Sequence, residues 1–213
     1  MDLELTAEEA RVMGCLLEKK MATPEYYPLT LNALVSAVNQ KVNRLPVVDY
    51  DEAIVRVAAE GLREQRVLWV NMSGRVAKYG EGLVERYELT NDQAALLCVL
   101  LLRGPQTVGE LRSRSERLSE FADLETVQQT LDGLAERGFA QESTRLAGQK
   151  ETRFRQLLSV TDEIPPTVVS PDSIEPVTTT RERIADLEEK VTRLTADLED
   201  LQQAFSLFKE QFE

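Results

Sequence analysis

The sequence predicts a mainly helical α+β fold in which one small module occurs twice and a long helix follows. The stretch Leu5–Ala10 opens an amphipathic segment, and Leu89–Ala94 opens a second one with the same pattern of residue types. Further along, Glu60–Glu64 recurs as Asp132–Glu136. An internal repeat of this kind indicates two structural units in tandem. The third observation is a heptad pattern over residues 181–213, which predicts a coiled-coil helix.

The composition limits the classes of function. The chain has 213 residues, of which 42% are hydrophobic, and this is enough for a packed core. Its formal net charge is −12, but residues 1–158 hold 20 of the 25 basic residues and 24 of the 37 acidic ones, so this part is only mildly acidic. The chain contains no histidine, which removes the commonest general base and metal ligand. We therefore expect a protein that is not an enzyme and that has no catalytic residues, no metal and no cofactor.

The cysteines and the N-terminal sequence bear on the compartment. Cys15 and Cys98 lie in apolar helical runs, which favours buried thiols in a reducing environment; a bridge between equivalent helices of the two modules is the alternative. The segment Met1–Glu4 has no basic residue, and no apolar run approaches the roughly 18 residues of a membrane span. We expect a cytoplasmic protein with no membrane partner.

In the first module, residues 1–86, cap residues predict where three helices begin. Thr6 and Glu9 form a capping box, in which each side chain hydrogen-bonds the other residue's backbone N–H. Thr30 starts the second helix, and Asp49 is expected to cap the third. The predicted buried face of the third helix consists of Ile54, Ala58 and Leu62.

A β-hairpin follows the third helix in both modules. Val67–Val70 is β-branched and aromatic, Ser73-Gly74 is a turn, and Val76–Tyr79 can return as the second strand. The second module, residues 87–158, repeats the same order. Its predicted helices begin at Thr90, Thr107 and Asp123, and its predicted strands begin at Phe139 and Thr152.

Gly61 and Gly133 occupy corresponding positions inside the third helices. A glycine in a helix interior costs about 1 kcal/mol relative to alanine. Its presence in both modules predicts that another element packs closely against the helix there.

Three helices followed by a hairpin, with short connections, is the order of a winged-helix domain, in which the third helix is the candidate recognition helix and the hairpin is the wing. The chain also resembles the YceH-like family of bacterial proteins. The resemblance is carried by Leu5–Leu17, by Ala37–Val47 with its Asn-Gln-Lys-x-Asn-Arg-x-Pro-Val string, and by Tyr50-Asp51. It implies two winged-helix domains and a C-terminal coiled region, but no particular activity. Val38 stands where relatives are expected to have cysteine, which argues against a thiol role in this loop.

Two further segments follow the modules. Residues 159–180 contain four prolines and no hydrophobic period, which predicts a semi-rigid Pro-rich linker. In residues 181–213, apolar residues recur at steps of three and four, and a coiled coil of two copies would make a homodimer; a lone helix that packs on its own domains is the alternative. The residues expected in the dimer interface are Ile184, Leu187, Val191, Leu194, Leu198, Leu201, Phe205 and Phe208.

Duplex DNA is one candidate partner. The third helices begin with acidic residues, which repel phosphate and are explained as helix caps. Cations lie instead in the loop that enters the first of these helices, after the second helix of the second module (Arg112, Arg114 and Arg117), and on the wings. Such cations can contact phosphates without reading sequence, whereas glutamines can read bases. The candidate contact residues for nucleic acid or a partner are Asn39, Gln40, Lys41, Asn43, Arg44, Arg75, Lys78, Gln128, Gln129, Arg145, Lys150 and Arg153, with Gln128 and Gln129 as base readers.

The sequence leaves two functions open. The first is a DNA-associated regulator that contacts the phosphate backbone through the wings and the 39–46 loop. The second is an acidic winged-helix adaptor that binds another protein in a larger complex. The 39–46 loop itself has two interpretations, because its polar side chains either pin the loop to the backbone or contact a ligand or partner. For the scattered cations, the alternative is an ordinary mixed-charge surface.

Overall fold

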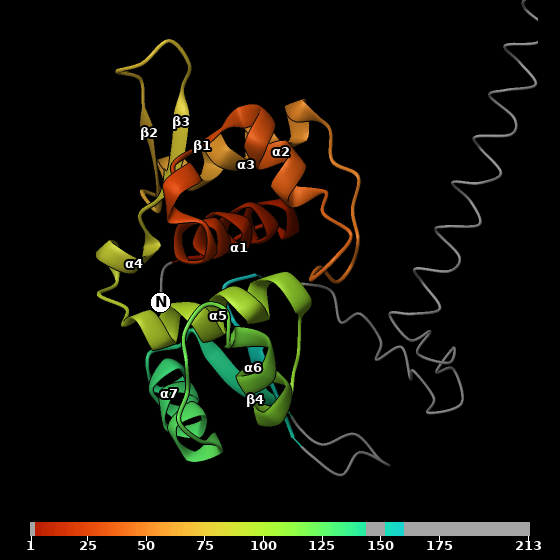
Figure 1. Ribbon diagram of the computed structural model, residues 1–213, viewed down its shortest axis with the longest axis vertical. Coiled ribbons are helices and arrows are strands. Elements are labelled where there is room, and N and C mark those ends of the chain that lie inside the picture. The colour runs from red at the N-terminus through yellow and green to blue at the C-terminus, as the bar shows by residue number, and fades with distance from the viewer. Residues whose placement is uncertain (1–2, 144–151, 160–213) are drawn as a thin grey trace, which may run out of the picture. The chain divides into compact units, whose positions relative to one another are not determined.

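The computed structural model describes residues 3–143 and 152–159. The chain divides into two units, Met1–Asp162 and Glu163–Glu213, and all the described residues belong to the first. This part of the chain has a mainly helical α+β fold, with seven α-helices and two small antiparallel sheets (Figure 1). None of the helices in it is long and apolar enough to cross a bilayer. The eight predicted dimer residues and all but the first residue of the predicted linker lie outside the described residues.

The first repeat has the predicted order of three helices and a hairpin. These elements are α1 (Ala7–Ala22), α2 (Leu31–Val38), α3 (Glu52–Glu64), β2 (Leu68–Asn71) and β3 (Lys78–Glu81). A short 3₁₀ helix, η1 (Pro24–Tyr26), and a two-residue strand, β1 (Leu29–Thr30), precede α2. Strand β1 pairs antiparallel with β3, so the sheet order is β1-β3-β2. The predicted hairpin is therefore confirmed, with each strand shifted by one or two residues and a third strand added.

The second repeat has the same order after a four-residue helix, α4 (Leu83–Arg86). Its elements are α5 (Asn91–Arg103), α6 (Val108–Ser115), α7 (Leu124–Glu136), β4 (Ala140–Ser143) and β5 (Arg153–Gln156). The predicted helix starts are confirmed, because Thr90 and Thr107 form capping boxes and Asp123 accepts a hydrogen bond from the backbone of Thr126 at 2.8 Å. The capping box of Thr6 in the first repeat is also formed.

The start of α3 differs from the prediction. The N-cap is Asp51 and not Asp49, because its carboxylate accepts the backbone N–H of Ile54 at 2.8 Å. The side-chain amide of Asn39 binds both the N–H and the C=O of Tyr50, at 2.8 Å each, and this keeps Tyr50 outside the helix. The prediction that Ile54 is buried was also wrong, since it is 39% exposed and the buried face begins at Val55.

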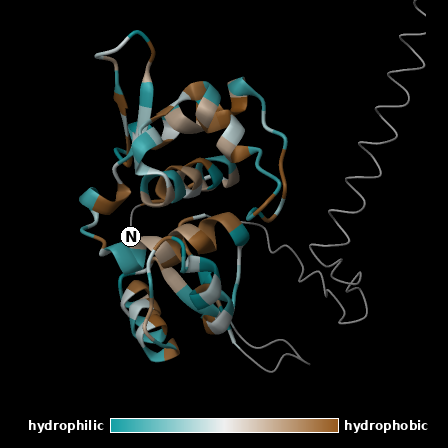
Figure 2. Ribbon diagram, viewed as in Figure 1, coloured by the Kyte–Doolittle hydropathy of each residue, from teal (hydrophilic) through white to brown (hydrophobic). Residues whose placement is uncertain are grey.

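Helices α1 and α5 lie side by side and join the two repeats (Figure 1). Hydrophobic residues occupy most of α5, as the colours of Figure 2 show. At Gly14 the approach is so close that an added Cβ would lie 2.8 Å from Leu102 Cδ2. The thiol of Cys98 donates to the Gly14 carbonyl at 3.4 Å, and both cysteines are buried and free. The backbone N–H of Leu5 also donates to the Leu158 carbonyl at 2.6 Å, so the two repeats share one core.

The predicted close packing at the helix-three glycines is confirmed at Gly61 but not at Gly133. A Cβ at Gly61 would overlap Oε1 of Glu9, and a Cβ at Gly133 would lie 3.4 Å from Nε2 of Gln93. Glu9 and Gln93 are the equivalent capping-box residues of the two repeats. Gly61 therefore makes room for the cap of α1, whereas a Cβ at position 133 would meet only an ordinary contact.

Candidate functional site

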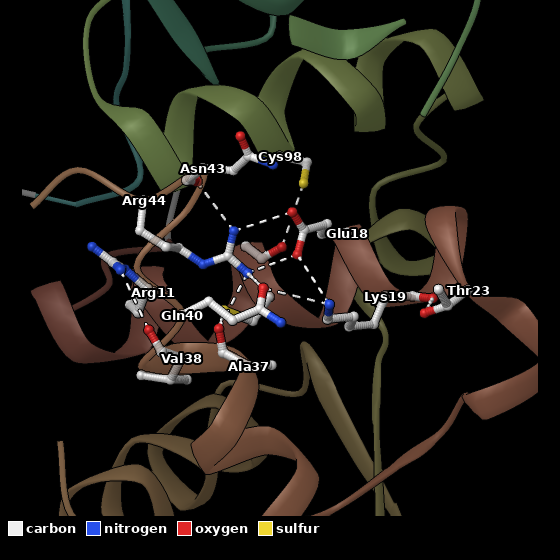
Figure 3. A network of polar contacts seen from close by, with 12 residues as sticks. Arg11, Glu18, Lys19, Thr23, Ala37, Val38, Gln40, Asn43, Arg44 and Cys98 are labelled. Carbon is white, nitrogen blue, oxygen red and sulfur yellow. Dashed lines mark hydrogen bonds and ion pairs between the residues drawn. The ribbon is translucent and has the colours of Figure 1, made fainter. Parts of the chain in front are cut away.

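The loop between α2 and α3 holds a buried ion pair (Figure 3). Arg44, which is 5% exposed, donates from both terminal nitrogens to the Glu18 carboxylate of α1, at 3.1 and 2.7 Å. The same guanidinium donates to the Ala37 carbonyl and to Oε1 of Gln40, each at 3.2 Å. Burial by itself lowers the pKa of Arg44, but the hydrogen bonds and charge of Glu18 outweigh it and raise the pKa above its usual value. Arg44 is therefore a charged group held inside the fold.

Other side chains fix the backbone of this loop from both ends. Arg11 of α1 is buried and donates to the carbonyls of Val38 and Pro46, and burial lowers its pKa. Asn39 binds the backbone of Tyr50, as described above. These hydrogen bonds satisfy backbone groups that the irregular chain would otherwise bury without partners.

The middle of the loop reaches the second repeat. Asn43 has a left-handed backbone with φ of 63°, which asparagine tolerates better than most residues, and its side-chain oxygen accepts a hydrogen bond from Arg103 of α5. The N–H of Leu45 donates to the Leu102 carbonyl at 2.8 Å. Lys41, in contrast, is exposed and makes no hydrogen bond or ion pair with any described residue. The loop thus combines inward groups that hold the fold with an outward cation.

A cleft of about 440 Å³ lies beside this loop, between the end of α1, the loop, α5 and the end of α6. Three of the candidate contact residues, Gln40, Lys41 and Asn43, line it together. Its apolar wall includes Val99 and Leu102 of α5. Its charged residues are one carboxylate and five cations, namely Glu18 with Lys19, Lys41, Arg103, Arg114 and Arg117.

None of the described candidate contact residues on the two hairpins belongs to this cleft lining. Arg75 and Lys78 are exposed on the first hairpin and pair with no described residue. Arg153 of β5 donates to Glu110 at 2.8 Å and to the Pro105 carbonyl at 3.0 Å. Arg145 and Lys150 lie outside the described residues.

On the third helices, α3 and α7, arginine and glutamine side chains bind acidic side chains of the same helix. On α3, Arg56 pairs with Glu52 and Arg63 pairs with Glu60. Helix α7 contains no lysine or arginine. Its Gln128 donates to Asp132 at 2.8 Å, and its Gln129 donates to Glu125 at 3.4 Å.

Comparison with known sequences identifies the family. The family model described as "Protein of unknown function, DUF480" matches residues 5–149. The chain belongs to this family. It is 47% identical to a UPF0502 protein of Solibacter usitatus over 215 residues and 46% identical to a UPF0502 protein of Pelobacter propionicus over 219 residues, with 100% of each chain covered in both cases. A UPF0502 protein of Opitutus terrae is 49% identical over 159 residues, which cover 72% of this chain and 69% of that one. The resemblance inferred from the Asn39–Val47 string is thereby confirmed.

Sequence reasoning on this DUF480 member missed part of the cleft. Glu18, Lys19 and Arg103 were not among the candidate contacts, because they lie inside helices whose apolar pattern drew attention to the core. A signal was present, since Lys19 and Arg103 each stand thirteen residues after the N-cap threonine of an equivalent helix. Aligning the two repeats would have found this shared basic position.

Proposed function

We propose that this protein is a non-enzymatic adaptor built from two tandem winged-helix modules, and that it binds another protein through the outer face of α3. The shared order of three helices and a hairpin supports the winged-helix assignment. The observation that carries the proposed function is that neither α3 nor α7 has a cation without an acidic partner.

Recognition helices that read DNA present arginine, lysine, asparagine or glutamine to base edges, and they approach a dense row of phosphates. Both cations of α3 are paired within the helix, and α7 has none. The glutamines of α7 bind neighbouring carboxylates. Acidic side chains therefore dominate both faces, and they would repel a phosphate backbone.

An exposed apolar group lies at the centre of the α3 face. Val57 is 73% exposed and Ile54 is 39% exposed, and residues three apart are neighbours on a helix surface. Glu60 and Glu64 are exposed and lie three and seven positions after Val57, on the same side of the helix. Exposed apolar surface with a polar rim is typical of protein interaction sites, and the acidic rim favours a basic, apolar segment of the partner.

The test uses the full chain and two matched variants. Val57 and Tyr26 are both 73% exposed, so Val57→Arg and Tyr26→Arg add the same charge at equally exposed positions, on α3 and on η1. Proteins that the immobilised full chain retains after nuclease treatment are identified and purified, and their binding to each variant is titrated by calorimetry. We expect Val57→Arg to weaken the partner's binding at least tenfold and Tyr26→Arg to change it less than twofold. Equal effects of the two variants would contradict the α3 assignment.

A second candidate is contact of the first hairpin with the DNA backbone. It is favoured by Arg75 and Lys78, which are exposed and have no acidic partner among the described residues. Fluorescence anisotropy with a labelled duplex tests it, because phosphate contacts weaken steeply as salt rises. Binding that falls with salt and is lost in the Arg75→Ala/Lys78→Ala variant would establish this candidate over the adaptor.

We also propose that the heptad pattern of residues 181–213 pairs two copies in a coiled coil. Its apolar positions repeat at steps of three and four over the whole segment. The full chain should sediment as a dimer, and Leu194→Glu with Leu198→Glu should give a monomer because charge is buried at a and d positions. Unchanged sedimentation of the double variant would refute the pairing.

A further inference from the structure

The cleft beside the 39–46 loop has walls from both repeats and an excess of positive charge. We propose that it binds a small oligophosphate anion, of the diphosphate or triphosphate class, and that the bound anion links the two repeats. This site is separate from the α3 face of the proposed adaptor function, and neither proposal depends on the other.

The single carboxylate in the lining does not neutralise the cations. Glu18 is bound at 2.7 and 3.1 Å by Arg44, which lies behind the lining, and the Lys19 ammonium is 3.7 Å from Glu18. Lys41 and Arg117 form no hydrogen bond or ion pair with any described residue. The cleft therefore presents uncompensated positive charge, which concentrates anions.

The arginines on the α5 and α6 side are also only partly compensated. Arg103 donates to a neutral amide oxygen, that of Asn43. Burial lowers the pKa of Arg103, and the nearby charges of Arg114 and Arg44 lower it further. Arg114 lies 3.4 Å from Glu110 and donates to Gln106 at 2.7 Å. An anion in the cleft would relieve the repulsion among these like charges.

The number of cations and the size of the cleft indicate the class of anion. A single phosphate group carries at most about two negative charges near neutral pH, whereas five cations line this cleft. The charge of diphosphate or triphosphate matches five cations better. Guanidinium groups also bind phosphate oxygens in a bidentate geometry. A volume of about 440 Å³ lies within the range of small-ligand sites.

The end of helix α1 does not oppose this assignment. A helix C-terminus carries partial negative charge on its last carbonyls. Here the Lys19 carbonyl accepts both the N–H and the hydroxyl of Thr23, at 3.1 and 3.3 Å. The nearby ammonium of Lys19 belongs to the cleft lining and offsets the partial negative charge of the other carbonyls at this helix end.

Calorimetry on the full-length protein tests the proposal, with inorganic pyrophosphate and triphosphate as probes, citrate as a carboxylate comparison, and metal-free buffer of low salt. Lys41→Ala with Arg117→Ala removes two exposed cations from the cleft without breaking a side-chain hydrogen bond or ion pair between described residues. Arg75→Ala with Lys78→Ala removes the same charge from the hairpin and is the matched control. We expect triphosphate affinity to fall at least tenfold in the cleft variant and less than twofold in the control, with thermal unfolding of both variants unchanged.

Several results would overturn the proposal. One is the absence of measurable heat with either phosphate probe at millimolar concentration. Another is an equal loss of affinity in the two double variants, which would indicate a bulk charge effect. Citrate binding as tightly as triphosphate would remove the phosphate assignment. Binding of duplex DNA, but of neither probe, through Lys41 and Arg117 would assign the cleft to a nucleic-acid backbone instead.

Discussion

Removing either partner of the Arg44–Glu18 pair should destabilise the fold, and removing both should cost well below the sum of the two single losses. In Glu18→Leu, the guanidinium keeps its hydrogen bonds to carbonyl and amide oxygens but loses its only carboxylate, while its side chain remains 0% exposed. A buried charge without a counter-ion costs about 3–5 kcal/mol. The Glu18 side chain is 14% exposed, so water screens part of the interaction and the expected loss is at the lower end, about 3 kcal/mol.

The double variant separates the pair from its surroundings. Arg44→Leu leaves a carboxylate that is partly exposed and lies 3.7 Å from Lys19, so we expect a smaller loss, about 2 kcal/mol. Glu18→Leu with Arg44→Leu leaves no unpaired charge, and its cost should be well below the sum of the single losses. The expected coupling energy is about 2 kcal/mol or more, as is found for residues in one network.

Urea unfolding followed by circular dichroism measures these losses on the full chain. For a unit of this size, about 3 kcal/mol corresponds to a fall of roughly 6–12 °C in the unfolding temperature. Arg56→Leu, which breaks an exposed pair on α3, is the control and should cost less than about 1 kcal/mol. Additive single losses, or a Glu18→Leu variant as stable as this control, would refute the view that the loop is fixed by a desolvated ion pair.

Three further predictions concern packing, thiols and pH. Gly133→Ala should stabilise the protein by up to about 1 kcal/mol in urea unfolding, because alanine favours a helix and its Cβ meets only an ordinary contact. The equivalent Gly61→Ala should show no such gain, because its Cβ would displace the capping carboxylate of Glu9. Burial raises the pKa of Cys15 to about 11 and also raises the pKa of Cys98. Both thiols should therefore react with Ellman's reagent at neutral pH only as fast as the protein unfolds. Rapid reaction of the thiols in the folded protein would contradict this. Hydrogen bonds at the start of α7 hold the pKa of Asp123 below 3.8, so its contribution to stability is present above that pH and is lost as pH falls through the lower folded value. In urea melts between about pH 5 and 2.5, Asp123→Asn should therefore lose less stability than the natural chain.

Local signals in the sequence predicted most of the helix starts, because a cap is made by residues only three positions apart. The capping boxes at Thr6, Thr90 and Thr107 needed no knowledge of tertiary structure. The predicted cap of α3 was wrong because the start of this helix depends on a side chain that is distant in the sequence. Asn39 binds both backbone groups of Tyr50, so that Asp51 becomes the N-cap and the helix begins at Glu52.

Other parts of the fold left weaker signals. Strand β1 has two residues, which is too short to show an alternating pattern. The central position of α5 was readable in principle, because a helix that is apolar on all sides is buried on all sides. Its residues Ala94 to Leu102 are all buried.

The cleft could not be predicted in the same way, because its cations come from four separate segments of the chain. Lys41 and Arg117 were visible as loop cations, but Arg103 belongs to a helix and its partner Asn43 lies 60 residues away. Charge density in a cleft depends on which segments fold together. The sequence therefore indicates the cations, whereas only the packing of α1 on α5 shows that they converge.

The connection between the second and third helices differs in length between the two repeats. The segment between the second and third helices runs from Asn39 to Asp51 in the first repeat but only from Glu116 to Asp123 in the second. The extra length lets this loop reach α5, where the N–H of Leu45 binds the last turn. Because the loop also carries Lys41 and fixes Arg44 against α1, the added residues both close the interface between the repeats and form one wall of the cleft. The cleft therefore arises from the asymmetry between the two copies, and shortening this loop should disturb the repeat interface and anion binding together.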